Sequence, residues 1–161
     1  MAQYINDRGN FRYSSKYRTL MNCFIKMAKM DHVLDDNLIE SVPHLLVIAA
    51  IIGHSKGLKE DVEKEYNDVY IGGFASTFHD QRLDFWVAMI VWLDEGGDEE
   101  TELFKPEFDV EVCNKFNQLA MGGLGYLYKK QFNDETSDTT GLSLIQEELR
   151  KAFLAFKAKQ N

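Results

Sequence analysis

The chain has 161 residues, of which 45% are hydrophobic and 27% charged, and its formal net charge is −8. This length suits one domain with a sizeable core, and the composition excludes an intrinsically disordered protein. The apolar runs are too short for a membrane span of roughly 20 residues, and the first residues lack the apolar segment of a secretory signal. Cys23 and Cys113 are isolated thiols that fit a reducing compartment, so we expect a cytoplasmic protein.

Charge is distributed unevenly along the chain. Residues 1–30 carry a net charge of +5, residues 31–128 carry −14, and residues 129–161 carry +1. An acidic body repels nucleic acid and anionic membranes at long range, whereas the basic end attracts them locally. Pairing of the basic end with acidic side chains of the same protein is the alternative, and exposed opposite charges commonly pair in this way.

The N-terminal part is predicted to be an arm followed by a helix. Residues 1–14 are polar with scattered aromatic side chains and form the arm, and residues 15–161 form a single helical domain. Ser14 or Ser15 can cap the first helix, whose apolar positions keep helical spacing as far as about Met30.

The next predicted elements are a central helix and an irregular stretch. Ser41 followed by Pro43 is a helix start signal, and Gly53 is predicted to end this helix. Its sequence, VPHLLVIAAIIG, is apolar on all sides, which places it at the centre of the fold. Farther along, alternating residues predict a short strand around residues 66–74.

Three more helices complete the predicted bundle. Thr77 and Asp80 form a variant capping box before a second almost uniformly apolar helix, which is also expected at the centre and closes at Gly96-Gly97. Asp109 caps the following helix, and a capping box at Ser143 begins the last one. The sequence therefore predicts an all-α, single-domain bundle of five or six helices.

Three glycines, Gly122, Gly123 and Gly125, lie inside the helix that follows Asp109. Each costs about 1 kcal/mol relative to alanine at an interior helical position. A phosphate-binding loop would need a preceding strand or a Gly-Lys-Ser/Thr sequence, and neither is present. Apolar spacing continues from Phe116 to Leu127, so we expect one unbroken helix that a neighbouring helix approaches more closely than the usual 8–10 Å. A kink is the alternative.

Catalytic and metal-binding patterns are weak in this sequence. The chain has four histidines, none of which forms a metal-binding pair at helical spacing: His32, His44, His54 and His79. Asp80 and Asp84 beside His79 could form an acid–base cluster, but acidic residues in a first helical turn more often complement the helix dipole. We expect no catalytic residue, no metal and no cofactor.

Three segments carry a resemblance to a known family. They are HLLVIAAIIGHSKGLKE, LDFWVAMIVWLDEGGD and KFNQLAMGGLGYLYKK. In this order they resemble the Dnd-system-associated proteins of the fourth type, which are small bacterial proteins that accompany DNA phosphorothioation and its linked restriction genes. The resemblance covers about residues 44–132. Met121 stands where the family has asparagine, and Glu60 and Asp61 dilute the basic stretch that follows Gly57.

The resemblance implies a setting in DNA modification or anti-phage defence, without catalytic residues to transfer. We therefore expect a non-enzymatic accessory protein that acts through protein contacts and has no membrane partner, and we leave a homo-oligomer open. The alternative is a nucleic-acid-binding regulator that uses the basic arm, with at most weak, non-specific binding. A small hydrolase built around His79, Asp80 and Asp84 ranks last.

The candidate binding residues fall into two groups. Four are basic residues interleaved with aromatic side chains near the N-terminus, a combination that can grip phosphates while stacking on bases: Arg8, Arg12, Lys16 and Arg18. Two more, Lys56 and Lys59, come from the basic stretch of the family resemblance.

Overall fold

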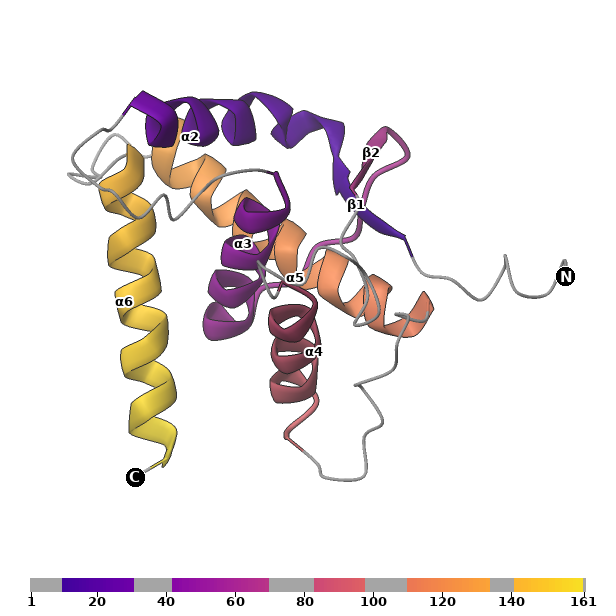
Figure 1. Ribbon diagram of the computed structural model, residues 1–161, viewed down its shortest axis with the longest axis vertical. Coiled ribbons are helices and arrows are strands. Elements are labelled where there is room, and N and C mark those ends of the chain that lie inside the picture. The colour runs from indigo at the N-terminus through magenta and orange to yellow at the C-terminus, as the bar shows by residue number, and fades with distance from the viewer. Residues whose placement is uncertain (1–9, 31–41, 70–82, 98–109, 134–140, 161) are drawn as a thin grey trace, which may run out of the picture.

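The computed structural model describes residues 10–30, 42–69, 83–97, 110–133 and 141–160 (Figure 1). In chain order the elements are β1 (Phe11–Ser14), the 3-10 turn η1 (Ser15–Tyr17), α2 (Arg18–Met30), α3 (Val42–Lys56), β2 (Tyr66–Val69), α4 (Leu83–Asp94), α5 (Val110–Tyr128), the π-helical turn η3 (Lys129–Asn133) and α6 (Gly141–Gln160). The five α-helices and one short two-stranded sheet of the described part confirm the predicted helical class with a small β segment.

Helix α3 lies at the centre of the bundle. Leu45, Leu46, Ala50 and Ile52 are completely buried, as expected for a helix that is apolar on all sides. In Figure 1, α5 crosses α3, α2 runs along one end of the bundle, and α6 descends at its side. This arrangement places the C-terminal end of α3 among α4, α5 and α6.

Helix α4 differs from the expectation that it would also be central. Among the side chains of α4 that the structure describes, four are buried: Val87, Ala88, Ile90 and Val91. The opposite side of the helix is partly open to solvent, and Trp86 is 39% exposed. A uniformly apolar sequence does not reveal which side of a helix the rest of the fold covers, so the sequence could not separate these two faces.

The end of the predicted arm is a strand rather than an arm. Phe11, Tyr13 and Ser14 of β1 are buried, and β1 pairs antiparallel with β2, with Phe11 opposite Val69 and Ser14 opposite Tyr66. The Arg12 amide donates to Asn117 Oδ1 of α5 at 3.1 Å. Strand β1 is therefore held between β2 and α5, and β2 agrees with the first part of the strand predicted at 66–74.

Two helices end at glycine, one of them later than expected. Gly53 lies inside α3, and the helix ends instead at Gly57, whose φ is 66°. The Leu58 amide donates to the Gly53 carbonyl at 2.8 Å, the long bond of a Schellman motif. Helix α4 closes in the same way at Gly96-Gly97, as predicted, since the Gly97 amide donates to the Trp92 carbonyl at 2.9 Å.

The start of the last helix also differs from the sequence prediction. Helix α6 begins at Gly141, whose amide donates to Gln131 Oε1 at 2.7 Å, so Ser143 lies inside the first turn. The capping positions Thr77, Asp80 and Asp109 fall outside the described residues.

Candidate functional site

The glycines of α5 lie where other parts of the backbone come close. A Cβ atom on Gly123 would collide with the Ala49 carbonyl group of α3, and one on Gly122 would collide with the Leu58 carbonyl group. Helix α3 supplies a matching position, because a Cβ on Gly53 would collide with the Leu119 carbonyl oxygen. At the crossing, each helix therefore has a glycine, without a side chain, where it contacts the backbone of the other. Helix α5 continues through its glycines without a break.

A histidine–carboxylate–lysine network joins the C-terminal ends of α3 and α4. His54 Nδ1 lies 3.0 Å from Asp94 Oδ1, and Lys59 Nζ lies 2.9 Å from Asp94 Oδ2. Burial raises the pKa of Asp94, but the hydrogen bonds from His54 and Lys59 outweigh it, so the pKa lies below its ordinary value. Asp94 is consequently held as a carboxylate that ties the two helices together.

A second carboxylate, Glu148 of α6, is 3% exposed on the other side of the same helix end. The Tyr126 hydroxyl donates to Glu148 Oε1 at 3.1 Å. Lys56 Nζ lies 3.0 Å from Oε2, although this contact falls outside hydrogen-bonding angles, and it also lies 4.4 Å from the centre of the Tyr126 ring. Lys56 and Lys59 are thus both paired with carboxylates of the same chain, and the Lys59 side chain is itself 54% exposed.

Two of the basic residues near the N-terminus, Arg12 and Lys16, pair with acidic side chains of β2 and of the segment that precedes it. Arg12 Nε lies 3.1 Å from Asp68 Oδ1, and Lys16 Nζ lies 2.6 Å from Glu60 Oε1 and 2.8 Å from Glu63 Oε1. For Arg12 and Lys16 this is the internal pairing that the charge distribution offered as an alternative, with the acidic side chains supplied by residues 60–68.

Tyr17 shares the Glu60 carboxylate with Lys16. Its hydroxyl lies 2.9 Å and 2.8 Å from the two Glu60 oxygens, and Gly125 leaves the space that both side-chain ends occupy. Burial, and then the hydrogen bond to Glu60, raise the pKa of Tyr17 to about 12. The neutral phenol is therefore favoured in the folded protein.

Titration of the tyrosines by ultraviolet absorbance is expected to show this shift. One of the seven tyrosines should ionise near pH 12, and Tyr17→Phe should remove that step. Since the folded pKa is raised, the stabilisation is complete below pH 10 and is lost as the pH rises through about 12. Wild type should therefore lose more stability across that range than Tyr17→Phe. Equal losses in the two proteins would contradict the assignment.

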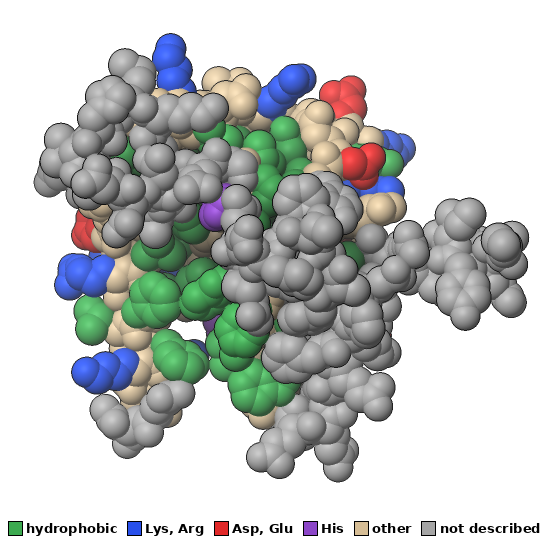
Figure 2. All heavy atoms as spheres, in the orientation of Figure 1, with side chains coloured by type: hydrophobic (Ala, Val, Ile, Leu, Met, Phe, Trp, Pro, Cys, Tyr) green, Lys and Arg blue, Asp and Glu red, His purple; other side chains and the backbone are tan. Residues whose placement is uncertain are grey.

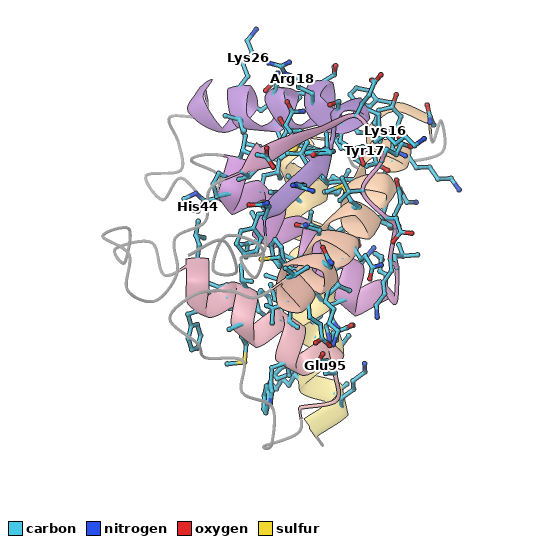
Figure 3. All side chains as sticks on the ribbon, turned by 90° about the vertical axis from the view of Figure 1, so that its right-hand side faces the viewer. Lys16, Tyr17, Arg18, Lys26, His44 and Glu95 are labelled. Atoms are coloured by element: carbon cyan, nitrogen blue, oxygen red, sulfur yellow. The ribbon has the colours of Figure 1, made fainter. Side chains whose placement is uncertain are left out.

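Two other basic side chains are placed differently. Arg18 and Lys26 lie on the exposed face of α2 and point away from the bundle (Figure 3). Neither makes an ion pair with any residue in the described part of the chain. Arg8 lies outside the described residues, as do His79 and Asp80, and the side chain of Asp84 is not described, so the acid–base cluster has no described geometry.

Large apolar side chains remain exposed on α4 and on the last turns of α6. Phe153 and Leu154 are each 53% exposed, Phe156 is 41% exposed, and Trp86 of α4 is 39% exposed. Figure 2 shows hydrophobic side chains gathered over both helices on the two sides of an opening. Sequence reasoning missed this surface; the signal was the apolar run AFLAF, which continues after the covered part of α6 ends.

Comparison with protein-family models, curated proteins and solved structures gives no match for this chain. Within the described ranges, no helix has the length and apolar character to cross a membrane. The same part of the chain contains no group of three side chains arranged to hold a metal ion.

Proposed function

We propose that this chain is an accessory protein that acts through protein contacts. The observation that carries the proposal is the apolar surface on α4 and the end of α6, where Trp86, Phe153, Leu154 and Phe156 meet solvent. Large exposed apolar patches mark surfaces that bind another protein or a membrane, or ligand-binding grooves. Aromatic side chains such as these three are enriched at the centre of protein–protein interfaces.

The proposed setting is a DNA-modification or anti-phage defence system in the bacterial cytoplasm. It is supported by the family resemblance and by the way the three resembling segments meet in space. Residues 44–60 pack on the glycines of α5, and Asp94 of the second segment binds His54 and Lys59 of the first. The three resembling segments thus contact one another, next to the exposed apolar surface.

Co-purification from the native host tests this proposal. The full chain should retain a protein partner encoded near defence or DNA-modification genes after nuclease treatment. Phe153→Asp with Phe156→Asp should release it, whereas Phe132→Asp, a matched change at a residue that is 46% exposed in η3, should not. Retention that depends on intact DNA would contradict the proposal.

Nucleic-acid binding is a second candidate because Arg18 and Lys26 project from α2 without an ion-pair partner among the described residues. We expect at most weak, non-specific binding to duplex DNA, opposed by the acidic body. Arg18→Ala with Lys26→Ala should weaken that binding and flatten its salt dependence, by about 0.9 in log–log slope per lost phosphate contact.

Arg12→Ala with Lys16→Ala is the matched control, since those two side chains are already paired with Asp68, Glu60 and Glu63. This control should leave weak DNA binding nearly unchanged. The dependence of DNA affinity on salt concentration can be measured by fluorescence anisotropy. If only the Arg12→Ala with Lys16→Ala variant changed this dependence, then Arg12 and Lys16, and not α2, would contact DNA.

A further inference from the structure

A cavity of about 320 Å³ lies between the two-stranded sheet and α5. Its polar lining comes from β1, from β2 with the segment before it, and from one face of α5: Arg12, Asp61, Tyr66, Asn114, Asn117 and Gln118. Ligand pockets span about 300–1,000 Å³, so this volume suits a small ligand. In Figure 1 the two strands and α6 lie on opposite sides of the bundle, so the cavity is separate from the apolar surface at the end of α6.

Hydrogen bonds tie the walls of this cavity to one another. Asn117 is 4% exposed, and its Oδ1 accepts from the Arg12 amide at 3.1 Å while its Nδ2 donates to the Asn10 carbonyl at 2.9 Å. On the next residue of α5, Gln118 Nε2 donates to Asp61 Oδ1 at 2.7 Å. Strand β1 and the segment before β2 are both fastened to α5, so the cavity is formed before any ligand enters it.

Two of the three charged side chains in the lining are already neutralised within the chain. Arg12 Nε lies 3.1 Å from Asp68 Oδ1, and Glu63 Oε1 lies 2.8 Å from Lys16 Nζ. Asp61 differs, because the only hydrogen bond that it accepts from the described residues comes from a neutral side-chain amide. Asp61 therefore gives the cavity one negative charge that no described cation balances.

The other hydrogen-bonding atoms of the lining are mostly acceptors. Asp61 Oδ2, Glu63 Oε2 and Gln118 Oε1 accept no hydrogen bond from any residue in the described ranges, and the Asn114 amide has no partner there. A carboxylate accepts hydrogen bonds and cannot donate them when ionised. The ligand that fits this lining is therefore positively charged and rich in N–H donors.

The apolar part of the lining favours an organic cation over a metal ion. Tyr66 is 42% exposed, and its ring already accommodates one guanidinium, since Arg12 Cζ lies 4.4 Å from the ring centre. Val62 lines the cavity beside it. Hard divalent cations prefer several carboxylate and carbonyl oxygens, whereas this lining combines one unbalanced carboxylate with an aromatic ring and a valine.

We propose that this cavity binds a guanidinium or ammonium group on a short aliphatic stem. Asp61 Oδ2 and the amide oxygens of Asn114 and Gln118 accept hydrogen bonds from the cation, and the stem lies against Val62 and Tyr66. The net charge of −8 attracts such cations at long range. The cation belongs either to a free small molecule or to an arginine side chain of a protein. This inference goes beyond the proposed function, which rests on a different surface.

Titration of the ¹⁵N-labelled full chain, followed by nuclear magnetic resonance, tests the site with matched probes. Butylguanidine should shift the side-chain amide signals of Asn114, Asn117 and Gln118, with a dissociation constant of about 1 mM or lower. Butylurea has the same shape without the charge and should shift none of them. Acetyl-arginine-methylamide distinguishes the two sources, because it should bind as well as butylguanidine if the site takes a protein side chain and at least about tenfold more weakly if it takes a free molecule.

Two carboxylate variants separate the cavity from the acidic surface around it. Asp61→Asn keeps the oxygen that accepts from Gln118 but removes the charge, and it should weaken butylguanidine binding at least about tenfold. Glu65→Gln removes the same charge from a residue outside the lining and should bind like wild type. Asn114→Ala, a change on the exposed side of α5, should weaken binding by about threefold without depending on the fold of the acidic segment.

Three results would overturn the inference. The first is equal binding of butylguanidine and butylurea, or of neither. The second is an equal loss in Asp61→Asn and Glu65→Gln, which would show attraction to the acidic surface in general. The third is that calcium chloride shifts these amide signals and butylguanidine does not. Phe153→Asp with Phe156→Asp should bind butylguanidine like wild type, so failure of the proposed function and failure of this site are observed separately.

Discussion

Replacing Gly123 with alanine is expected to lower the free energy of unfolding by about 2 kcal/mol or more. A Cβ at this position would lie 2.6 Å from the Ala49 carbonyl carbon and nearer still to its oxygen, and both atoms belong to the backbone of the central helix. Alanine would gain about 1 kcal/mol of helix propensity over glycine. Overpacking typically costs about 1–3 kcal/mol and more where the neighbour cannot yield, so the clash dominates.

The other glycines of α5 provide a graded comparison. At Gly122 the added Cβ would meet the Leu58 carbonyl and the Lys59 amide nitrogen, which belong to a loop that can shift more easily than α3. At Gly125 it would lie 3.0 Å from Glu60 Oε2 and Tyr17 OH, which are ends of side chains. We expect Gly125→Ala to stay within about 1 kcal/mol of wild type, with Gly122→Ala intermediate.

Thermal unfolding followed by circular dichroism measures this order. For a chain of this size 1 kcal/mol corresponds to about 2–4 °C, so Gly123→Ala should melt at least about 4 °C below wild type. If Gly123→Ala melted as high as Gly125→Ala, the close crossing of α3 and α5 would not limit the stability of the fold.

The sequence revealed one side of this crossing but not the other. Unbroken apolar spacing through Gly122 and Gly123 indicated a close neighbour, because glycine inside a helix has a cost that something must offset. Gly53 followed an apolar run and matched a helix stop, yet α3 continues past it and uses it as a contact. Stop and contact glycines look the same locally, and only the position of the second helix distinguishes them.

Strand β1 and the histidine–carboxylate–lysine network were not predicted from the sequence, for a related reason. Phe11 and Tyr13 alternate with polar residues over only four positions, and their burial depends on α5 and β2, which are far along the chain. Asp94 looked like an ordinary helix-end residue, and its partners His54 and Lys59 precede it by 35 to 40 positions. The local sequence pattern predicts whether a segment is a helix or a strand. Pairs of residues that are far apart in the sequence are set by how the elements pack, which the local pattern does not show.

The buried carboxylate of Glu148 leads to the second large prediction. Lys56→Met is expected to lower the free energy of unfolding by about 2–3 kcal/mol. Breaking a buried ion pair from one side typically costs about 3–5 kcal/mol because the remaining charge is uncompensated. The effect should be smaller here, since the Tyr126 hydroxyl remains 3.1 Å from Oε1 and Lys151 Nζ lies 3.6 Å from the same atom.

A double-mutant cycle distinguishes a lost charge pair from lost packing. Adding Glu148→Leu to Lys56→Met should recover most of the stability, since an apolar replacement of a buried pair is often neutral or stabilising. Glu148→Leu alone should cost less than Lys56→Met alone, because the Lys56 side chain is 28% exposed and can reach water, whereas Glu148 is 3% exposed. Chemical denaturation of the four proteins gives the coupling energy. Additive losses would mean that Lys56 stabilises α3 by packing on Tyr126 and not by neutralising Glu148.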